Sequence, residues 1–401
     1  MSNEVVIVGG ARTPMCEYVG TPGFGKFKDL SAIDLAVHAS QAALERSGVS
    51  GDSVEHVVMG NALQTSMDAI YGARHVGLKA GVAQSAPALT VNRLCGSGIQ
   101  SIVNGAQMMQ LGEVTTVLAG GMENMSQAPY VLYGARRGFP FGKAPEMQDM
   151  LFGSLQDPYA ELFMAQTAER LAKRLDISRA DQDAYALRSH QLGAAAVTEG
   201  RFAEEIAPVT LKSRKGELVV DTDDHIRPDT TLEGLAKLRA AFGKDGTVTA
   251  GNASGIVDGA AAVVLTTAER AAADGLDVWA KVRAWGIAGV DPKEMGIGPV
   301  PAITKCLERA GVSKDEVDLI EINEAFSAQY LACEKELGLD RDKCNVNGGA
   351  ISLGHPLGAT GTRLVLTLMY QLRRSGKRLG VASACIGGGQ GIAMLIENPK
   401  A

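Results

Sequence analysis

The chain has 401 residues, of which 46% are hydrophobic and 21% charged, a balance typical of a protein with a large buried core. This length predicts two or three compact units. The net charge of -6, with scattered Lys and Arg, excludes a nucleic-acid-binding protein, and no apolar run approaches the roughly 20 residues of a membrane span. The opening MSNEVVIVGG does not resemble a signal peptide, so we expect a cytoplasmic location and six reduced cysteines.

Strands and helices alternate along the first third of the chain. Short apolar runs predict buried strands, and apolar residues at helical spacing predict helices. The expected elements are strands at 5–8, 57–59 and 116–119 and helices at 34–48 and 95–109. The strand at 5–8 is expected to end at a turn at Gly9-Gly10, and Gly120-Gly121 is expected to follow the strand at 116–119. This order predicts a mainly parallel, right-handed α/β layer.

The last third repeats this plan, with strands expected at 319–322 and 379–384 and a helix at 358–372. We therefore expect two similar halves, in which Cys95-Gly-Ser-Gly corresponds to Gly354-His355-Pro356.

Between the halves, residues 125–254 do not continue this alternation of strands and helices. Helices are expected at 165–175 and 179–198, and a hairpin or loop at 209–228. An insertion of this length is expected to carry a binding surface.

Cys95 stands in Asn92-Arg-Leu-Cys95-Gly-Ser-Gly, at the start of a predicted helix. The positive end of a helix dipole lowers the pKa of a nearby thiol, and flanking glycines let a substrate approach the sulfur. Cys95 is therefore a candidate nucleophile. The alternative is a buried structural cysteine.

Two further motifs place reactive groups at strand ends. His355, in Gly354-His355-Pro-Leu-Gly, is a candidate general base for a thiol, and the alternative is a residue that caps a helix or lines a turn. Cys385, in Cys385-Ile-Gly-Gly-Gly, is either a reactive or a buried thiol. Its glycines match a dinucleotide fingerprint poorly, because no helix and acidic residue follow. Strand ends converge on one face of such a fold, which favours a shared site.

Asn323-Glu-Ala-Phe follows the strand at 319–322. Asn323 could orient a water or donate to an oxyanion, and Glu324 could be a buried acid or a carboxylate at a helix start. Both are also ordinary capping residues. No paired Cys or His spacing is present, so we expect no metal site.

Together, these four motifs resemble the motif set of the thiolase family. The resemblance covers essentially the whole chain, including Gly251-Asn-Ala-Ser254-Gly and Asn347-Gly-Gly-Ala. It implies an acyltransferase that condenses acetyl-CoA to acetoacetyl-CoA, or cleaves 3-ketoacyl-CoA with CoA, by ping-pong chemistry through an acyl-cysteine. It also implies an α/β fold of five layers, αβαβα, built from two βαβαβ halves and an inserted loop domain that binds CoA. The implied boundaries are 1–124 plus 257–277 for the N-terminal half, 125–256 for the loop domain and 278–401 for the C-terminal half.

The resemblance assigns a role to each motif. Cys95 would be the acylated nucleophile, His355 would activate it, and Cys385 would move the α-proton of acetyl-CoA. Asn323 would hold a water that forms one oxyanion hole with His355. The backbone N–H groups of Cys95 and Gly387 would form the other.

The resemblance also implies contacts with coenzyme A, which would be a substrate, so no cofactor is expected. Ser254 would contact the pantetheine arm and Arg227 would lie near the adenine. Phe163 and Met164 would also belong to the CoA site, where Phe163 would shape the acyl pocket. Phe163 stands where biosynthetic acetoacetyl-CoA thiolases commonly have a histidine, which leaves longer or branched 3-ketoacyl-CoA substrates open. Relatives are homodimers or homotetramers, so we expect a homo-oligomer.

Two alternatives differ in their residues. A decarboxylating condensing enzyme of the ketoacyl-synthase kind uses a cysteine with two histidines, or with a histidine and an asparagine, and Cys385 argues against it. A non-catalytic scaffold with the same fold would lack at least one of four residues, and all are present: Cys95, Asn323, His355 and Cys385.

Overall fold

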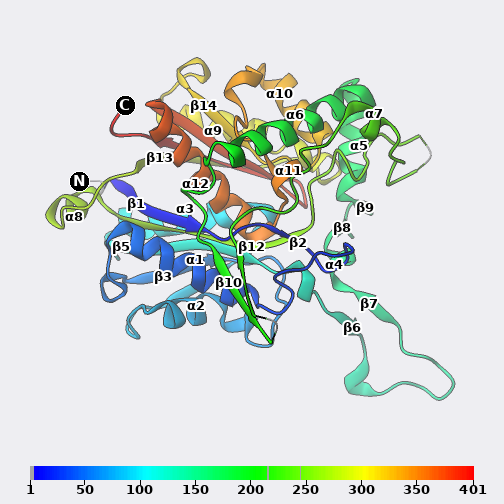
Figure 1. Cartoon of the computed structure of the whole chain (residues 1–401), viewed down its shortest axis with the longest axis horizontal. Helices are drawn as coiled ribbons and strands as arrows, with labels where there is room; N and C mark the ends of the chain where they lie inside the picture. Colours follow the sequence, from blue (N-terminus) through cyan, green and yellow to red (C-terminus); the bar gives the residue numbers. More distant parts are fainter. Residues whose placement is uncertain (1–3, 215, 244) are drawn as a thin grey trace.

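The computed structural model describes residues 4–214, 216–243 and 245–401. A ten-stranded sheet crosses this part of the chain in the order β14-β15-β16-β13-β1-β12-β5-β3-β4, with β2 paired beside β12 (Figure 1). Its strands are β1 (Val5–Arg12), β2 (Cys16–Glu17), β3 (His56–Gly60), β4 (Ala88–Val91), β5 (Thr116–Glu123), β12 (Val257–Thr267), β13 (Ala280–Gly289), β14 (Leu319–Ile322), β15 (Leu379–Ile386) and β16 (Gln390–Glu397).

The sheet consists of two similar halves. The order β1-β12-β5-β3 in one half matches β13-β16-β15-β14 in the other. The pair directions also match, because the first two pairs of each series are antiparallel and the third is parallel. The halves join where β1 pairs with β13 through only two residue pairs, Val6 with Lys281 and Ile7 with Ala280. The prediction of a repeated plan is confirmed.

The prediction of a mainly parallel sheet is wrong. Among the described strands of this sheet, only β3–β4, β3–β5 and β14–β15 are parallel pairs. The tight turn at 387–389 leads from β15 directly into β16, and a connection this short joins antiparallel strands. Gly9-Gly10 and Gly120-Gly121 also lie inside β1 and β5 rather than beyond the ends of these strands, so both strands are longer than expected.

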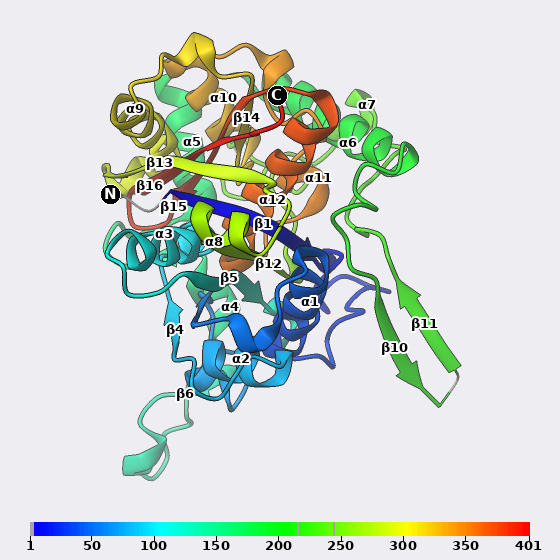
Figure 2. The same ribbon diagram turned by 90° about the vertical axis from the view of Figure 1, so that its left-hand side faces the viewer.

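Helices form three layers around the two half-sheets (Figures 1 and 2). One outer layer packs on the N-terminal half, a central layer lies between the half-sheets, and another outer layer packs on the C-terminal half. In that order their main helices are α1 (Ala32–Ser47) and α2 (Gly72–Ala80), then α3 (Ser97–Gln110) and α12 (Leu357–Ser375), then α9 (Pro299–Ala310) and α10 (Ser327–Leu337). The shorter helices α8 (Ala268–Ala273) and α11 (Ala350–Leu353) complete the two halves.

Strand periodicity accounts for the separate cores. On β1, Val6 and Val8 belong to the core beneath α1, whereas Val5 and Ile7 belong to the core around α3 and α12. Successive side chains of a strand point to opposite faces, so a strand that is covered on both sides is apolar throughout. This explains why the apolar run at 5–8 does not alternate.

The two central helices cross at glycines. A Cβ atom on Gly98 of α3 would lie 2.3 Å from the backbone nitrogen of Thr362 on α12, and one on Gly361 would lie 2.4 Å from that of Ile99. A Cβ atom on Gly121 of β5 would similarly lie 1.9 Å from the carbonyl oxygen of Gly358. Backbones therefore touch where most helix pairs are separated by side chains.

The chain between β5 and β12 leaves the central sheet. It contains β6 (Tyr130–Leu132), β7 (Met147–Asp149), α4 (Met150–Ser154), β8 (Gln156–Asp157), β9 (Leu162–Phe163), α5 (Met164–Arg174), α6 (Arg179–Thr198), β10 (Val209–Ser213), β11 (Gly216–Val220) and α7 (Leu232–Ala236). The β6–β7 and β10–β11 hairpins project from the body (Figures 1 and 2). The two helices expected here are confirmed, and a hairpin followed by a loop occupies 209–228. The domain boundaries stay a prediction.

Replacing Gly98 with Ala is expected to lower the unfolding temperature of the protein. Alanine favours a helix over glycine by about 1 kcal/mol, but overpacking a close contact typically costs about 1–3 kcal/mol. Gly153→Ala on α4 is the matched control, because a Cβ atom there meets no atom within 4 Å. Thermal unfolding should show a loss for Gly98→Ala only. Equal behaviour of the two variants would contradict the close crossing.

Candidate active site

Cys95 lies in a short 3-10 turn, Leu94–Gly96, directly before α3. The expected helix therefore starts at Ser97, two residues later than predicted. Leu94 has φ of 46°, a left-handed conformation that is uncommon for a leucine. The backbone N–H groups of Gly387 and of Cys95 itself lie near enough to the Cys95 sulfur to lower its pKa. These are the two groups that the sequence assigned to one oxyanion hole, so the structure brings them together.

Burial decides the protonation of Cys95. It raises the pKa of the thiol to about 11, although the two backbone N–H groups lower it. The negative carboxylate of Glu123 raises this pKa further. The expectation of a more acidic Cys95 is therefore wrong for the free protein, because desolvation outweighs the effect of the two backbone N–H groups. Cys95 is a neutral thiol near pH 7.

Cys385 is fully buried near the end of β15. It packs in a small apolar cluster with Met295 and Ala325, against which Met164 lies. Burial raises the pKa of the Cys385 thiol well above its ordinary value, and the nearby Cys95 raises it further. Cys95 is therefore close enough to Cys385 to affect its ionisation, and burial favours the protonated form of both thiols.

His355 is buried immediately before α12. Its backbone N–H donates to the carbonyl oxygen of Gly255 at 2.9 Å, and its Nε2 lies 3.3 Å from Nδ2 of Asn323. Burial, and then the positive charge of Arg363, lower the pKa of the imidazole to about 3. The ring is thus neutral at physiological pH and free to accept a proton.

Asn323 follows β14, and its backbone N–H donates to the carbonyl oxygen of Ser383 at 2.8 Å. Its Oδ1 atom is buried and has no hydrogen-bond donor in the described part of the chain. A buried acceptor of this kind is suited to a water or a substrate group. The neighbouring Glu324 is a buried acid whose carboxylate accepts hydrogen bonds from Tyr185 at 2.8 Å and Ser189 at 2.7 Å.

An apolar inner cavity of about 230 Å³ reaches His355. Three phenylalanine side chains form one wall, since the ring centroid of Phe163 lies 4.7 Å from that of Phe152 and 5.2 Å from that of Phe242. Met164 also lines this cavity, so the structure brings both of these predicted CoA-site residues, Phe163 and Met164, next to the predicted base.

An outer cavity of about 520 Å³, whose lining includes the charged side chains of Glu17 and Arg227, also reaches Ser254. Ser254, Gly255 and Ile256 line both cavities, and Arg227 and His190 line the outer one. The predicted contacts for pantetheine and nucleotide therefore lie along one path that leads inward to His355. A path of this shape suits a long thioester with a polar head and an apolar acyl end.

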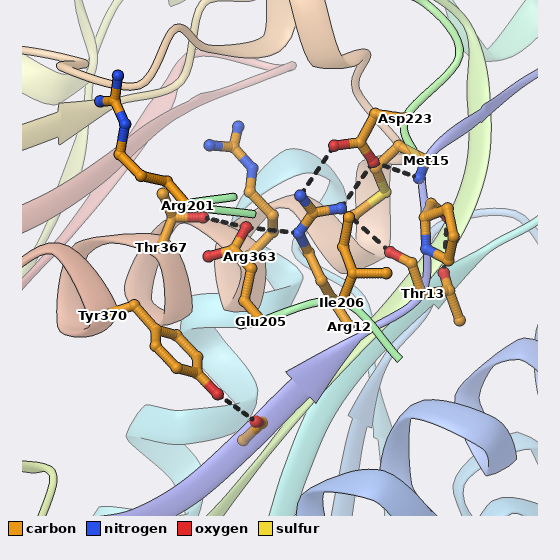
Figure 3. A network of polar contacts seen from close by, with 12 residues as sticks. Arg12, Thr13, Met15, Arg201, Glu205, Ile206, Asp223, Arg363, Thr367 and Tyr370 are labelled. Atoms are coloured by element: carbon orange, nitrogen blue, oxygen red, sulfur yellow. Dashed lines mark hydrogen bonds and ion pairs between the residues drawn. The ribbon is translucent and has the colours of Figure 1, made fainter. Parts of the chain in front are cut away.

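A buried ion network places the segment that carries Arg227 (Figure 3). The Arg12 guanidinium donates to Asp223 at 2.7 and 2.8 Å and to Glu205 at 2.6 Å. Asp223 also accepts the backbone N–H of Met15 at 2.7 Å. Arg227, which follows Asp223 by four residues, itself forms an ion pair with Glu17.

Several residues at the site escaped the sequence analysis. Glu123, at the end of β5, accepts hydrogen bonds from the backbone N–H of Gly358 at 2.8 Å and of Leu63 at 2.9 Å. It thereby anchors the start of α12 to the other half of the fold. Thr360 contacts His355 directly. Both residues lie close to glycines in the sequence, but only the three-dimensional contacts show what Glu123 and Thr360 do.

The described residues contain no group of three or more His, Cys, Asp or Glu side chains arranged to hold a metal ion. Within the same residues, no helix combines the length and the apolar character that spanning a bilayer requires. All six cysteines are free.

The alkylation of Cys95 by iodoacetamide should accelerate steadily from pH 7 to pH 10, because the thiolate fraction of a group with a pKa of about 11 keeps rising over this range. Mass spectrometry of the Cys95 peptide measures the rate. The unfolded chain is the control and should level off near the ordinary cysteine pKa of about 8.5. A plateau near neutral pH in the folded protein would show a preformed thiolate instead.

Comparison with known proteins places these residues in a family. The model of the thiolase N-terminal domain matches residues 5–269, and that of the thiolase C-terminal domain matches residues 276–398. The chain is 50% identical to the human 3-ketoacyl-CoA thiolase, mitochondrial, over 98% of each chain. It is 49% identical to beta-ketothiolase BktB of Cupriavidus necator, over 99% of this chain and all of that one.

Solved structures show the same fold. A crystal structure of human mitochondrial 3-ketoacyl-CoA thiolase in complex with CoA matches with a TM-score of 0.95 and 49% identity, covering 99% of this chain and 98% of that one. The crystal structure of the Bacillus anthracis acetyl-CoA acetyltransferase matches with a TM-score of 0.95 and 44% identity, covering 99% of each chain. The chain is a member of the thiolase family and has its five-layered α/β fold.

Proposed function

We propose that this thiolase uses Cys95 and Cys385 as two thiols with separate tasks, in the CoA-dependent cleavage of 3-ketoacyl-CoA and in the reverse condensation of acetyl-CoA. The observation that carries this proposal is the contact between the segment that contains Cys95 and the segment that contains Cys385. The backbone N–H of Gly387, two residues after Cys385, lies near enough to the Cys95 thiol to lower its pKa. Gly96 and Ile386, the neighbours of the two cysteines, also pack closely, since a Cβ atom on Gly96 would lie 2.5 Å from the Ile386 side chain. A second thiol is therefore held beside the first, next to the donors that an oxyanion needs.

The first half of the cleavage begins from neutral groups. His355 takes the proton from the Cys95 thiol, and the sulfur attacks the 3-keto carbon of the substrate. The bond between the second and third carbons breaks, and its electron pair takes the proton of the Cys385 thiol, so that acetyl-CoA leaves. Burial keeps both thiols protonated at the outset, which is the state this half-reaction requires.

The second half restores the enzyme. The thiol of free CoA gives its proton to the Cys385 thiolate, and its sulfur attacks the acyl carbon. Cys95 leaves and takes back the proton held by His355. A sequence in which acetyl-CoA departs before CoA reacts is ping-pong.

Cys385→Ala is expected to block carbon–carbon bond cleavage while leaving Cys95 able to take an acetyl group from acetyl-CoA. General acid–base groups typically contribute about 10²–10⁴-fold to the rate of a reaction, so the rate of thiolysis should fall by about 100-fold or more. Rapid-quench measurement of acetyl transfer, beside steady-state thiolysis, separates the two steps. Cys306→Ala is the control, because Cys306 is equally buried but packs in the core beneath α9. Equal loss of both steps in Cys385→Ala would overturn the division of tasks.

The apolar inner cavity favours 3-ketoacyl-CoA substrates longer than acetoacetyl-CoA. Phe163 there packs against two other rings and offers no hydrogen bond to a polar substrate group. The names of the relatives include both 3-ketoacyl-CoA thiolases and an acetyl-CoA acetyltransferase, so these names do not decide the length of the acyl chain. The proposed preference for longer substrates is therefore argued from the cavity.

Phe163→Ala should increase the ratio of kcat/KM for 3-ketooctanoyl-CoA to that for acetoacetyl-CoA by about tenfold or more, since space for one methylene is worth about 1–3 kcal/mol. Thiolysis rates with the two substrates measure this ratio. Phe141→Ala is the matched control, because Phe141 is fully exposed on the β6–β7 hairpin. An unchanged ratio would place the acyl chain elsewhere.

Coenzyme A enters this scheme as a substrate, and the proposal requires no resident cofactor. We also propose that the chain forms a homodimer or homotetramer. The sheet ends at β4, an edge strand with open hydrogen-bonding groups, and Leu89, Ile70 and Tyr71 expose apolar surface along it. Light scattering in solution tests this assembly. The cytoplasmic location stays a prediction.

A further inference from the structure

The imidazole of His355 is held at both of its nitrogens. Nδ1 lies 2.6 Å from Oγ1 of Thr360, and Nε2 lies 3.3 Å from Nδ2 of Asn323. Thr360 is fully buried in the first turn of α12, five residues after His355. In the proposed scheme one ring nitrogen accepts the Cys95 proton, and because Nδ1 is held against the Thr360 hydroxyl, we assign that role to Nε2.

The hydrogen bonds at the two ends of the ring require the same tautomer. The Thr360 hydroxyl has one proton to donate. Its oxygen, Oγ1, lies 3.0 Å from the carbonyl oxygen of Pro356, which can only accept a hydrogen bond. With that proton directed to Pro356, the Thr360 oxygen accepts a proton from Nδ1. The side-chain NH₂ of Asn323 only donates, so Nε2 must carry a lone pair. Both contacts therefore place the proton on Nδ1.

We infer that Thr360 is a positioning residue that holds neutral His355 in the tautomer with its proton on Nδ1 and its lone pair on Nε2. This inference rests on the proposed role of His355 as the base for Cys95. The opposite tautomer carries a proton on Nε2 and cannot accept another there. The group bonded to the second ring nitrogen commonly sets which nitrogen of a histidine is reactive.

A threonine positions a histidine ring differently from a carboxylate. It orients the ring but brings no negative charge to stabilise an imidazolium, and Arg363 on the same helix disfavours that cation. In the described residues, the contacts of the ring nitrogens are with the neutral side chains of Thr360 and Asn323. The proton transfer to Nε2 is therefore coupled to the attack of the Cys95 sulfur. As the S–H bond breaks, its electron pair forms the bond to the acyl carbon, so a Cys95 thiolate and the His355 imidazolium do not exist together before the attack.

Thr360→Val removes the hydroxyl but keeps the shape, and Thr360→Ser keeps the hydroxyl. We expect Thr360→Val to slow the acylation of Cys95 by about 10- to 100-fold, the usual effect of losing such a supporting contact, with little change in KM. Thr360→Ser should retain most of the rate. Stopped-flow or rapid-quench acylation by acetyl-CoA gives the rate, and steady-state thiolysis gives kcat and KM separately.

A spectroscopic readout distinguishes tautomer control from general loosening. The chain has six histidines, so ring-¹⁵N-labelled histidine gives a sparse NMR spectrum, in which His355→Gln identifies the His355 signals. The parent protein and Thr360→Ser should show the proton on Nδ1. Thr360→Val should show a shift of population toward the Nε2-protonated form. If Thr360→Val does not fold, Thr360→Ala provides the same comparison without a branched side chain.

Thr367→Val is the matched control. Thr367 is also buried on α12, and its hydroxyl donates to Glu205 at 3.1 Å rather than to His355. The Thr367→Val variant should lose thermal stability but keep the acylation rate of the parent protein and the His355 tautomer with its proton on Nδ1. Thr360→Val with the parent rate and spectrum, or with losses equal to those of Thr367→Val, would overturn the inference. Normal acylation in His355→Gln would instead overturn the proposed role of His355.

Discussion

The close crossing of α3 and α12 is the contact on which the site depends. Gly98 and Gly361 let the two helix backbones touch, so the segments that precede the helices converge from opposite halves of the fold. Cys95 precedes one helix and His355 the other. Glu123 strengthens the arrangement, because it accepts the N–H of Gly358 at the start of α12 while it belongs to a strand of the other half. A larger side chain at the crossing would separate the nucleophile from its base, even though it would touch neither.

Burial sets the chemical state of the reactive groups. It raises the pKa of Cys95 to about 11 and lowers that of His355 to about 3, so the resting site contains neutral partners instead of an ion pair. Such a site avoids holding separated charges in a poorly solvated interior. The same desolvation strengthens the backbone N–H groups that meet the Cys95 sulfur, since hydrogen bonds act more strongly where water is excluded. The reaction thus depends on charge that develops only as bonds change.

Local motifs predicted the reactive residues because each reactive group lies beside glycines at the end of a strand or the start of a helix. The uninterrupted apolar run at 5–8 likewise indicated a buried strand, and the charged segment at 179–198 a helix. The antiparallel strand β16 was missed because Gly387–Gly389 looks like the end of a strand, and only pairing with β15 shows it to be a hairpin turn. The state of Cys95 was misjudged because sequence shows a helix start but not how deeply the sulfur lies. Thr360 and Phe242 act through contacts with His355 and Phe163, and such contacts leave no local signal.

The central claim is that Cys95 alone carries the acyl group while Cys385 handles a proton. Acid quenching of the enzyme after mixing with acetyl-CoA, followed by digestion and peptide mass spectrometry, locates the bound acetyl group directly. The account predicts one acetyl group on the Cys95 peptide and none on the peptide that contains Cys385. An acetyl group on Cys385, or turnover with no covalent acyl-enzyme at all, would contradict it.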